Sequence, residues 1–421
     1  SLRLFLAQLY KTCGSPQVFF CNMTKDEKRI RAIKAYKEHM ENCRSAEAPG
    51  RIEFLGNHID YNGGKVLGAA INGIVCALAR PRKEQTIRLF SDSFENDAVD
   101  TSIRNISHRK RSESWANYPL GVLWALKEAG LFPDSGFELI LSTDLPLAAG
   151  LSSSAAVELA TALALLQLSG HKLGKSDLAR LCRRAENEFV GLPCGILDQG
   201  VSAYGEKDHL VLIDCVKESF STLPLPKHTC LWIFDTGIKH NLVDSLYSQR
   251  HSECKEALEL LKKQQPSLPC LAAASEGLLT SVHLPTPLSQ RALHVVRETA
   301  RVERAIKLLK DNASPKKIGE LLFDSHASSR DLFENSCPEL DFLVNELRGQ
   351  PGVLGARLTG GGFGGAALAW TGVEFSQTEA RATATAFKGA FGHNPSIHRF
   401  EASQGARITN PLEKRQSILC T

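Results

Sequence analysis

The clearest chemical signal in the sequence is a run of small residues and serines at positions 146–156, which reads PLAAGLSSSAA. Glycine and alanine leave backbone N–H groups uncovered, so that an anion can approach them. A helix that starts directly afterwards would direct its unpaired amides and the positive end of its dipole at the same point. Serine is also a favoured N-cap residue. The run therefore predicts either a phosphate-binding loop or a serine-rich helix cap.

A second segment, residues 48–64, reads APGRIEFLGNHIDYNGG and gathers Arg, His, Asp, Tyr and Asn between apolar runs. A turn-rich loop of this kind presents hydrogen-bond donors and acceptors to a polar ligand such as a sugar. On composition alone, a surface turn whose Asn and Asp cap the local backbone accounts for the same residues.

Two further segments carry carboxylates or clustered glycines. Glu186 lies near the end of an expected helix, and Asp198 lies in or just after a Gly/Pro turn. These carboxylates could converge on one cavity, one for a divalent cation and one for a substrate hydroxyl, or remain solvated surface groups.

Five glycines within residues 360–365 predict a turn where the backbone comes close to another group. A tight hairpin between two buried strands would satisfy the same pattern.

In chain order, these segments resemble the three signature motifs of the superfamily of galactokinases, homoserine kinases, mevalonate kinases and phosphomevalonate kinases (GHMP kinases). They are most similar to galactokinases: the first in its APGR start and HxDYNGG end, the second in PLxAGLSSSAA and the third in TGGGFGG. The similarity covers roughly residues 30–408. It implies a kinase that transfers the γ-phosphoryl group of ATP to the anomeric C1 hydroxyl of galactose.

The resemblance also assigns roles to individual residues. Asp198 and Arg51 would form the catalytic pair, in which Asp198 takes or orients the proton of the anomeric hydroxyl and Arg51 keeps Asp198 ionised. The implied sugar-binding residues are Asn57, His58, Asp60, Gly195, Asp198 and Tyr247. The implied ATP-binding residues are Trp115 at the adenine and Ala149, Gly150, Leu151, Ser152, Ser153, Ser154 and Ala155 at the phosphates, with Mg²⁺ held by Ser153 and Glu186. Positioning and charge neutralisation by such groups are what phosphoryl transfer requires of a protein.

One position departs from the family pattern, since Asn57 stands where galactokinases usually carry Glu, the acceptor for the C6 hydroxyl of the sugar. Asn is neutral and donates as well as accepts. Loss of an anion there removes repulsion against a C6 carboxylate. Galacturonate and N-acetylgalactosamine 1-kinases are therefore alternatives. A catalytically silent sugar and ATP sensor is a third, which the intact serine loop, Arg51, Glu186 and Asp198 disfavour.

The elements that must position these residues follow from the apolar patterning. The same resemblance implies a two-domain α+β fold with an N-terminal mixed-sheet domain, a C-terminal domain of helices on an antiparallel sheet, and the active site between them. We expect an N-terminal extension and lead-in helix over 1–46, the first domain over 47–218 and the second over 219–421. The predicted strands are 66–79, 86–90, 137–142, 353–358, 366–369 and one near Ile397, and the predicted helices are 25–43, 115–129, 155–168, 175–189, several within 242–348, and 378–391.

Composition narrows the class of protein. The chain has 421 residues, of which 43% are apolar and 23% charged, and a net charge of +4 with acidic and basic residues interspersed. This distribution favours no nucleic-acid or membrane partner, and the N-terminal apolar segment, residues 2–7, is too short to span a bilayer. The 12 cysteines form no CxxC pair, which is typical of reduced thiols in a cytoplasmic protein. The sequence leaves the oligomeric state open and is compatible with a monomer.

Overall fold

The computed structural model describes residues 42–93, 98–146, 150–239 and 243–410 of the chain. Two of the sequence predictions concern residues outside these ranges. Nearly all of the predicted lead-in helix over 25–43 and the predicted phosphate contact Ala149 lie outside the described residues. Among the described residues, no helix is long and apolar enough to cross a membrane.

The first domain is built on a mixed eight-stranded sheet in the order β12-β1-β2-β5-β3-β4, with β6 beside β2 and β7 beside β6. Only the β3–β5 pair is parallel, and the other pairs are antiparallel. The strands are β1 (Arg44–Leu55), β2 (Lys65–Pro81), β3 (Thr86–Ser91), β4 (Val99–Ser102), β5 (Phe137–Thr143), β6 (His209–Asp214), β7 (Ser219–Pro224) and β12 (Arg407–Thr409).

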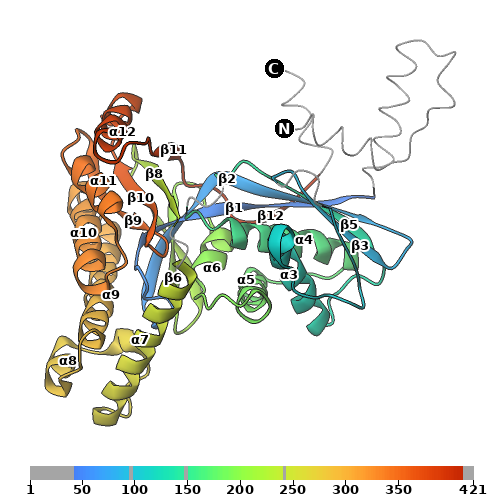
Figure 1. The fold of residues 1–421 in the computed structure, drawn as a ribbon, viewed down its shortest axis with the longest axis horizontal. Coiled ribbons are helices and arrows are strands. Elements are labelled where there is room, and N and C mark those ends of the chain that lie inside the picture. Colours follow the sequence, from blue (N-terminus) through green and yellow to red (C-terminus); the bar gives the residue numbers. More distant parts are fainter. Residues whose placement is uncertain (1–41, 94–97, 147–149, 240–242, 411–421) are drawn as a thin grey trace.

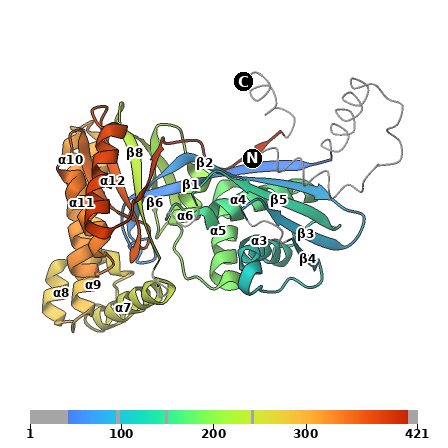
Figure 2. The ribbon, with the colours of Figure 1, turned by 45° about the horizontal axis from the view of Figure 1, so that its top comes forward.

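Helices cover one face of this sheet, as Figures 1 and 2 show. The central one, α4, consists mainly of Ala and Leu and lies against β1 and β2, where small side chains allow close approach. The helices of this domain are η1 (Arg111–Ala116), α3 (Asn117–Glu128), α4 (Ser153–Ser169), α5 (Lys175–Arg184), η2 (Ala185–Val190) and α6 (Leu197–Tyr204). The turn η2 continues α5 with π-helical hydrogen bonding, a distortion that often accompanies functional residues.

The second domain is an antiparallel sheet in the order β11-β8-β10-β9 with helices against it. Figure 1 shows α10, α11 and α12 beside this sheet, at the end of the molecule remote from α3 and α4. Its strands are β8 (Cys230–Lys239), β9 (Val353–Thr359), β10 (Gly364–Thr371) and β11 (Ser396–Phe400), and its helices are α7 (Val243–Gln264), η3 (Leu271–Ala273), α8 (Glu276–Val282), α9 (Leu288–Lys310), α10 (Pro315–Ser328), η4 (Ser329–Phe333), α11 (Pro338–Arg348) and α12 (Gln377–Phe391).

The two-domain α+β fold expected from the sequence is confirmed. The path of the chain between the domains differs in detail from the simple division at residue 219. Strand β7 pairs with β6 in the first sheet, and β12 returns to the edge of that sheet beside β1. The chain therefore passes to the second domain only after Pro224 and comes back near its end.

Candidate active site

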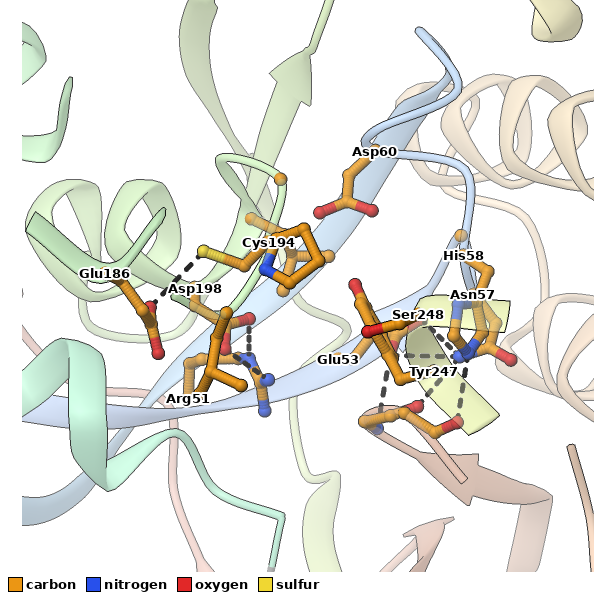
Figure 3. A pocket seen from close by; sticks show the side chains of 17 residues that line it. Arg51, Glu53, Asn57, His58, Asp60, Glu186, Cys194, Asp198, Tyr247 and Ser248 are labelled. Carbon is orange, nitrogen blue, oxygen red and sulfur yellow. Dashed lines mark hydrogen bonds and ion pairs between the residues drawn. The ribbon is translucent and has the colours of Figure 1, made fainter. Parts of the chain in front are cut away.

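Two adjoining cavities lie where the first domain meets the glycine turn between β9 and β10. Arg51, Leu192, Gly360 and Gly361 line both of them. One cavity is surrounded by polar and charged side chains from β1, the loop that follows it, η2, α6 and α7, and Figure 3 shows it from close by. We call it the acidic cavity. The other runs along the start of α4 towards Trp115, and we call it the serine-loop cavity.

Arg51 and Asp198 form a bidentate ion pair at the junction of the cavities. Arg51 Nε donates to Asp198 Oδ1 over 2.7 Å, and Arg51 Nη2 donates to Asp198 Oδ2 over 2.8 Å. The Ser152 hydroxyl donates to Asp198 Oδ2. Arg51 is buried on β1 and also donates through Nη1 to the carbonyl oxygen of Gly150, 2.7 Å away. Asp198 keeps about a quarter of its side chain exposed (24%), so a ligand can still reach its carboxylate.

The serine loop has the backbone that its sequence predicts. Gly150 has a φ of +68° and Ser152 a φ of +51°, so the chain turns through left-handed conformations directly before α4 begins at Ser153. The unpaired N–H groups of the first turn of α4 therefore point into the serine-loop cavity, which Gly150, Leu151 and the three serines line. Ala155 is fully buried below the loop.

Glu186 lines the acidic cavity from η2. Gln199 Nε2 donates to Glu186 Oε2 over 2.6 Å and to Glu158 Oε2 over 3.1 Å, so one amide links two buried carboxylates. The Cys194 thiol donates to Glu186 Oε2 over 3.3 Å. Burial is the main cause that raises the pKa of Glu186, and the Ser154 side chain opposes this shift through a hydrogen bond.

A divalent cation fits the oxygen atoms at this place. Among the residues that the structure describes, no three His, Cys, Asp or Glu side chains gather in a way that could hold a metal ion. Mg²⁺ does not need such a cage, because it is usually bound by one or two carboxylates, water and substrate phosphates. The donor set of Glu186 and the serine hydroxyls beside it contains only hard oxygen ligands, which suit Mg²⁺ carried by a nucleotide.

His58 and Asp60 line the acidic cavity with polar groups. His58 Nε2 lies 3.0 Å from the carbonyl oxygen of Gly361, and His58 Nδ1 lies 2.8 Å from the Tyr61 hydroxyl. Because a carbonyl can only accept, Nε2 carries the proton. Burial lowers the pKa of His58 to about 3, so its ring is neutral. Burial also raises the pKa of Asp60 to about 7.

Position 195 has no room for a side chain, because Asp60 lies directly beside it. A Cβ atom at position 195 would lie 2.0 Å from Asp60 Oδ2, which no side chain can tolerate. Tyr247, from α7, closes the same cavity and stacks at an angle against His58, with ring centroids 5.1 Å apart. All the described residues that the sequence assigned to the sugar therefore line one cavity.

Sequence reasoning missed Glu53, which lines the acidic cavity from β1. Its carboxylate accepts from the backbone N–H of Gly360 over 3.1 Å and from Asn57 Nδ2 over 3.2 Å. A signal was available, because side chains two residues apart on a strand point to the same face, and Glu53 follows Arg51 at that spacing. Cys194 and Ser248 are further lining residues that no motif indicated.

Trp115, the residue predicted to contact adenine, lines the serine-loop cavity together with Ser91, Asn117 and Tyr118. The structure thus brings the serine loop, Glu186 and the Arg51–Asp198 pair to one place, and the two cavities meet at Arg51.

Three family models match the chain. Residues 33–81 match the galactokinase galactose-binding signature, residues 117–206 match the N-terminal domain of GHMP kinases, and residues 289–393 match the C-terminal domain of GHMP kinases. These ranges include the serine loop, both members of the Arg51–Asp198 pair and the glycine turn.

Known galactokinases are similar to the chain over most of its length. A galactokinase of Roseiflexus sp. (strain RS-1) is 38% identical over 363 residues, which cover 85% of this chain and 91% of that protein. A galactokinase of Clostridium tetani is 35% identical over 390 residues, or 91% of this chain and 97% of that protein. The crystal structure of Lactococcus lactis galactokinase complexed with galactose superimposes with a TM-score of 0.83 at 31% identity and covers 90% of this chain and 99% of that one.

Proposed function

The chain belongs to the galactokinase family of the GHMP kinases, and on that premise we propose that it transfers the γ-phosphoryl group of ATP to the C1 hydroxyl of galactose. The observation that carries this proposal is the position of the Arg51–Asp198 pair, which lies at the junction of a serine-lined helix N-terminus and a polar cavity of sugar-binding type. Two substrates bound on either side of that pair would meet at Asp198.

Asp198 acts on the proton of the C1 hydroxyl. Its two oxygens are held by the Arg51 guanidinium and the Ser152 hydroxyl, so its orientation is fixed before the sugar binds. As the bond from the sugar oxygen to the γ-phosphorus forms, the bond from that phosphorus to the β–γ bridging oxygen breaks and ADP leaves. The hydroxyl proton passes to the Asp198 carboxylate, and the Arg51 charge offsets the negative charge that develops beside it.

The phosphates of ATP occupy the serine-loop cavity. Backbone N–H groups of residues 150–154 and the dipole of the 17-residue helix α4 supply a fixed positive potential for them. The adenine extends towards Trp115. Such preorganised dipoles need no rearrangement during phosphoryl transfer, which is the main source of catalysis in this reaction class.

Ser153 and Glu186 would hold Mg²⁺ when the nucleotide is bound. Ser154, whose side chain hydrogen-bonds to Glu186, follows Ser153 on α4. The bound Mg²⁺ would neutralise part of the negative charge of the phosphates. Glu158 and Gln199 support this carboxylate from below through the shared amide hydrogen bonds, which fixes the direction in which Glu186 points.

The sugar occupies the acidic cavity with its C1 hydroxyl at Asp198. Asp60 accepts hydrogen bonds from ring hydroxyls, Gly195 leaves the space that the Asp60 side chain fills, and Tyr247 covers the ring from α7. His58, held by Gly361 and Tyr61, fixes the shape of the wall.

The test of this proposal is ADP release from ATP and galactose in the presence of Mg²⁺, measured in a coupled assay. The Asp198→Asn variant is expected to reduce kcat by about 10²- to 10⁴-fold, the range for loss of an acid–base group, while galactose binding measured by calorimetry persists. Asp324→Asn, an exposed aspartate on α10, is the matched control. Wild-type turnover in Asp198→Asn would contradict the assigned role. Binding of both ligands by the wild-type protein without ADP release would instead identify a sensor.

A further inference from the structure

The side-chain amide of Asn57 is fully engaged in hydrogen bonds within the protein. Asn57 Nδ2 donates to the Glu53 carboxylate over 3.2 Å and to the carbonyl oxygen of Gly360 over 2.9 Å (Figure 3). Asn57 Oδ1 accepts from Ser329 Oγ over 3.1 Å and from Asn335 Nδ2 over 2.9 Å. The amide thus uses both of its N–H groups and both lone pairs of its oxygen. Asn57 lines the acidic cavity, but it has no hydrogen bond left to offer to a sugar.

The glycine turn between β9 and β10 is also held by Asn335, which is completely buried. Asn335 Nδ2 donates to the carbonyl oxygen of Gly361 over 3.1 Å, and the backbone N–H of Phe363 donates to the carbonyl oxygen of Asn335 over 2.7 Å. A Cβ atom at position 362 would lie 2.1 Å from that same oxygen. The turn therefore packs directly against Asn335.

The turn depends on such contacts because its own residues do not fix its shape. Four of the five glycines within residues 360–365 have a positive φ, and glycine moves between backbone conformations at little cost. The hydrogen bonds from Asn57 and Asn335 therefore determine where the backbone of the turn lies.

The same turn reaches the serine loop. Gly360 and Gly361 line both the acidic cavity and the serine-loop cavity. A Cβ atom at position 360 would lie 3.4 Å from the carbonyl oxygen of Gly150, so the backbones of the turn and the loop lie close together there. That carbonyl oxygen also accepts the hydrogen bond from Arg51 Nη1. Contacts thus run without a gap from Asn57 through the turn to the serine loop.

We propose that Asn57 is a positioning residue for both substrates: it fixes the glycine turn against the serine loop and thereby couples the binding of ATP to that of the sugar. This inference rests on the proposed function, because it assumes ATP in the serine-loop cavity and a sugar in the acidic cavity. Coupling between two sites requires an element whose arrangement both ligands bias, and the glycine turn borders both cavities. Asn57 thus has a different role from the sugar contact that the sequence resemblance implies.

Two variants remove a partner of Asn57 without touching either cavity. Ser329 and Asn335 are completely buried and line neither cavity. Ser329→Ala and Asn335→Ala should each raise KM for galactose and KM for ATP together, by about 3- to 10-fold, the effect of one hydrogen bond. Asn57→Ala should raise both at least as much. Partial unfolding would instead lower the number of active molecules, and so reduce the apparent kcat and leave both KM values unchanged.

Calorimetry measures the coupling itself. The dissociation constant of galactose is determined with and without a non-hydrolysable ATP analogue and Mg²⁺. In the wild-type protein the analogue should tighten galactose binding by at least about fivefold, the lower end of typical couplings. In Asn57→Ala and Ser329→Ala this factor should fall towards one. The same factor in the wild-type protein and in Asn57→Ala would overturn the inference.

The matched control is Thr383→Val on α12, which removes a completely buried hydroxyl that lines neither cavity. It should leave both KM values and the coupling factor as in the wild-type protein. A rise in KM for galactose alone in Asn57→Ala would identify a direct sugar contact and contradict the inference. If the wild-type protein binds neither galactose nor the ATP analogue, the proposed function fails and this inference fails with it. If it phosphorylates galactose but Asn57→Ala keeps both KM values, only the role of Asn57 is wrong.

Discussion

Asp60 and His58 are neighbouring titratable groups whose pKa values move in opposite directions for the same reason. Burial disfavours the charged form of each, and thus lowers the pKa of His58 to about 3 and raises that of Asp60 to about 7. His58 therefore stays neutral at any pH at which the protein would be assayed. Asp60 is the group of this pair that changes charge near neutral pH, and only its ionised form accepts hydrogen bonds with both oxygens.

We predict from this that kcat/KM for galactose falls about tenfold per unit as the pH drops below 7 and is level above it, because kcat/KM reports the ionisation of the free enzyme. Asp60→Asn should give a low value that does not depend on pH in this range, whereas Asp324→Asn should keep the wild-type profile. Initial rates at low galactose between pH 5.5 and pH 8.5 test this. A level profile in the wild-type enzyme would show that Asp60 does not bind the sugar as an anion.

Glu53 shows why one site residue escaped sequence reasoning. The motifs emphasised loops rich in Gly, Asn and Asp, where ligand contacts are common, whereas Glu53 lies within a regular strand. Its importance depends on the approach of Gly360, about three hundred positions later in the chain. A contact of that kind comes from the tertiary fold, so the one local signal for Glu53 was its two-residue spacing from Arg51 along the strand.

At the scale of elements, Ser152 at the start of α4 has a strained backbone conformation and also contacts the catalytic aspartate. Ser152 adopts a left-handed conformation, with a φ of +51°, that costs most L-residues roughly 1–2 kcal/mol. Its hydroxyl reaches Asp198 from there. The strain thus holds the serine loop and the catalytic aspartate in one arrangement.

Two substitutions at this position should separate the strain from the contact. Ser152→Ala removes the hydroxyl and keeps the strain, while Ser152→Gly removes the hydroxyl and relieves it. Both should lower kcat to a similar extent, but the glycine variant should be more stable than the alanine variant by about 1 kcal/mol. Urea unfolding and steady-state kinetics on the two proteins test this. An alanine variant at least as stable as the glycine variant would mean that the left-handed conformation carries no strain.

Half of the strands in the described residues were predictable, and β1, β4, β6, β7, β8 and β12 were not. Apolar and β-branched runs gave β2, β3, β5, β9 and β10 close to their observed bounds, and helical periodicity gave α4 and α12. Strand β12 was missed because it has three residues, which are exposed or half-buried, and so lacks an apolar pattern. It exists because β1 offers an edge to pair with. Strand β7, which was not among the predicted strands, is an edge strand that ends at Pro224.

At the scale of the whole molecule, the end of β1 attaches the first domain to the second. The backbone N–H groups of Gly56 and Asn57 donate to Glu298 Oε1 over 3.0 and 3.2 Å, and His294 Nε2 lies 3.0 Å from the carbonyl oxygen of Asn57. Glu298 and His294 both come from α9 and are completely buried. The sugar-binding loop is therefore held by side chains of the second domain, so that the fit of the acidic cavity depends on the two domains staying together.

The Glu298 carboxylate is ionised in this interface. Burial raises its pKa, but Arg301, Arg357 and His294 together with the Ser325 hydroxyl outweigh that effect and bring it down to about 2. Because the pKa is lower in the folded protein than in the unfolded chain, the carboxylate contributes stability above about pH 4.3, and this contribution is lost as the pH falls towards 2. No sequence pattern indicates this, since Glu298 and Arg301 look like an ordinary exposed pair on one helix face.

Glu298→Gln is therefore expected to lower the free energy of unfolding by about 3 kcal/mol at pH 7, and the difference from the wild-type protein should shrink as the pH falls from 4.5 towards 2. The matched control is Glu303→Gln on the same helix. Glu303 also reaches across to the first domain, through Lys65, but is half exposed (51%), so its loss should cost less than about 1 kcal/mol. Urea unfolding at several pH values measures both. Equal stabilities of the wild-type and Glu298→Gln proteins at pH 7 would mean that the buried carboxylate does not hold the domains together.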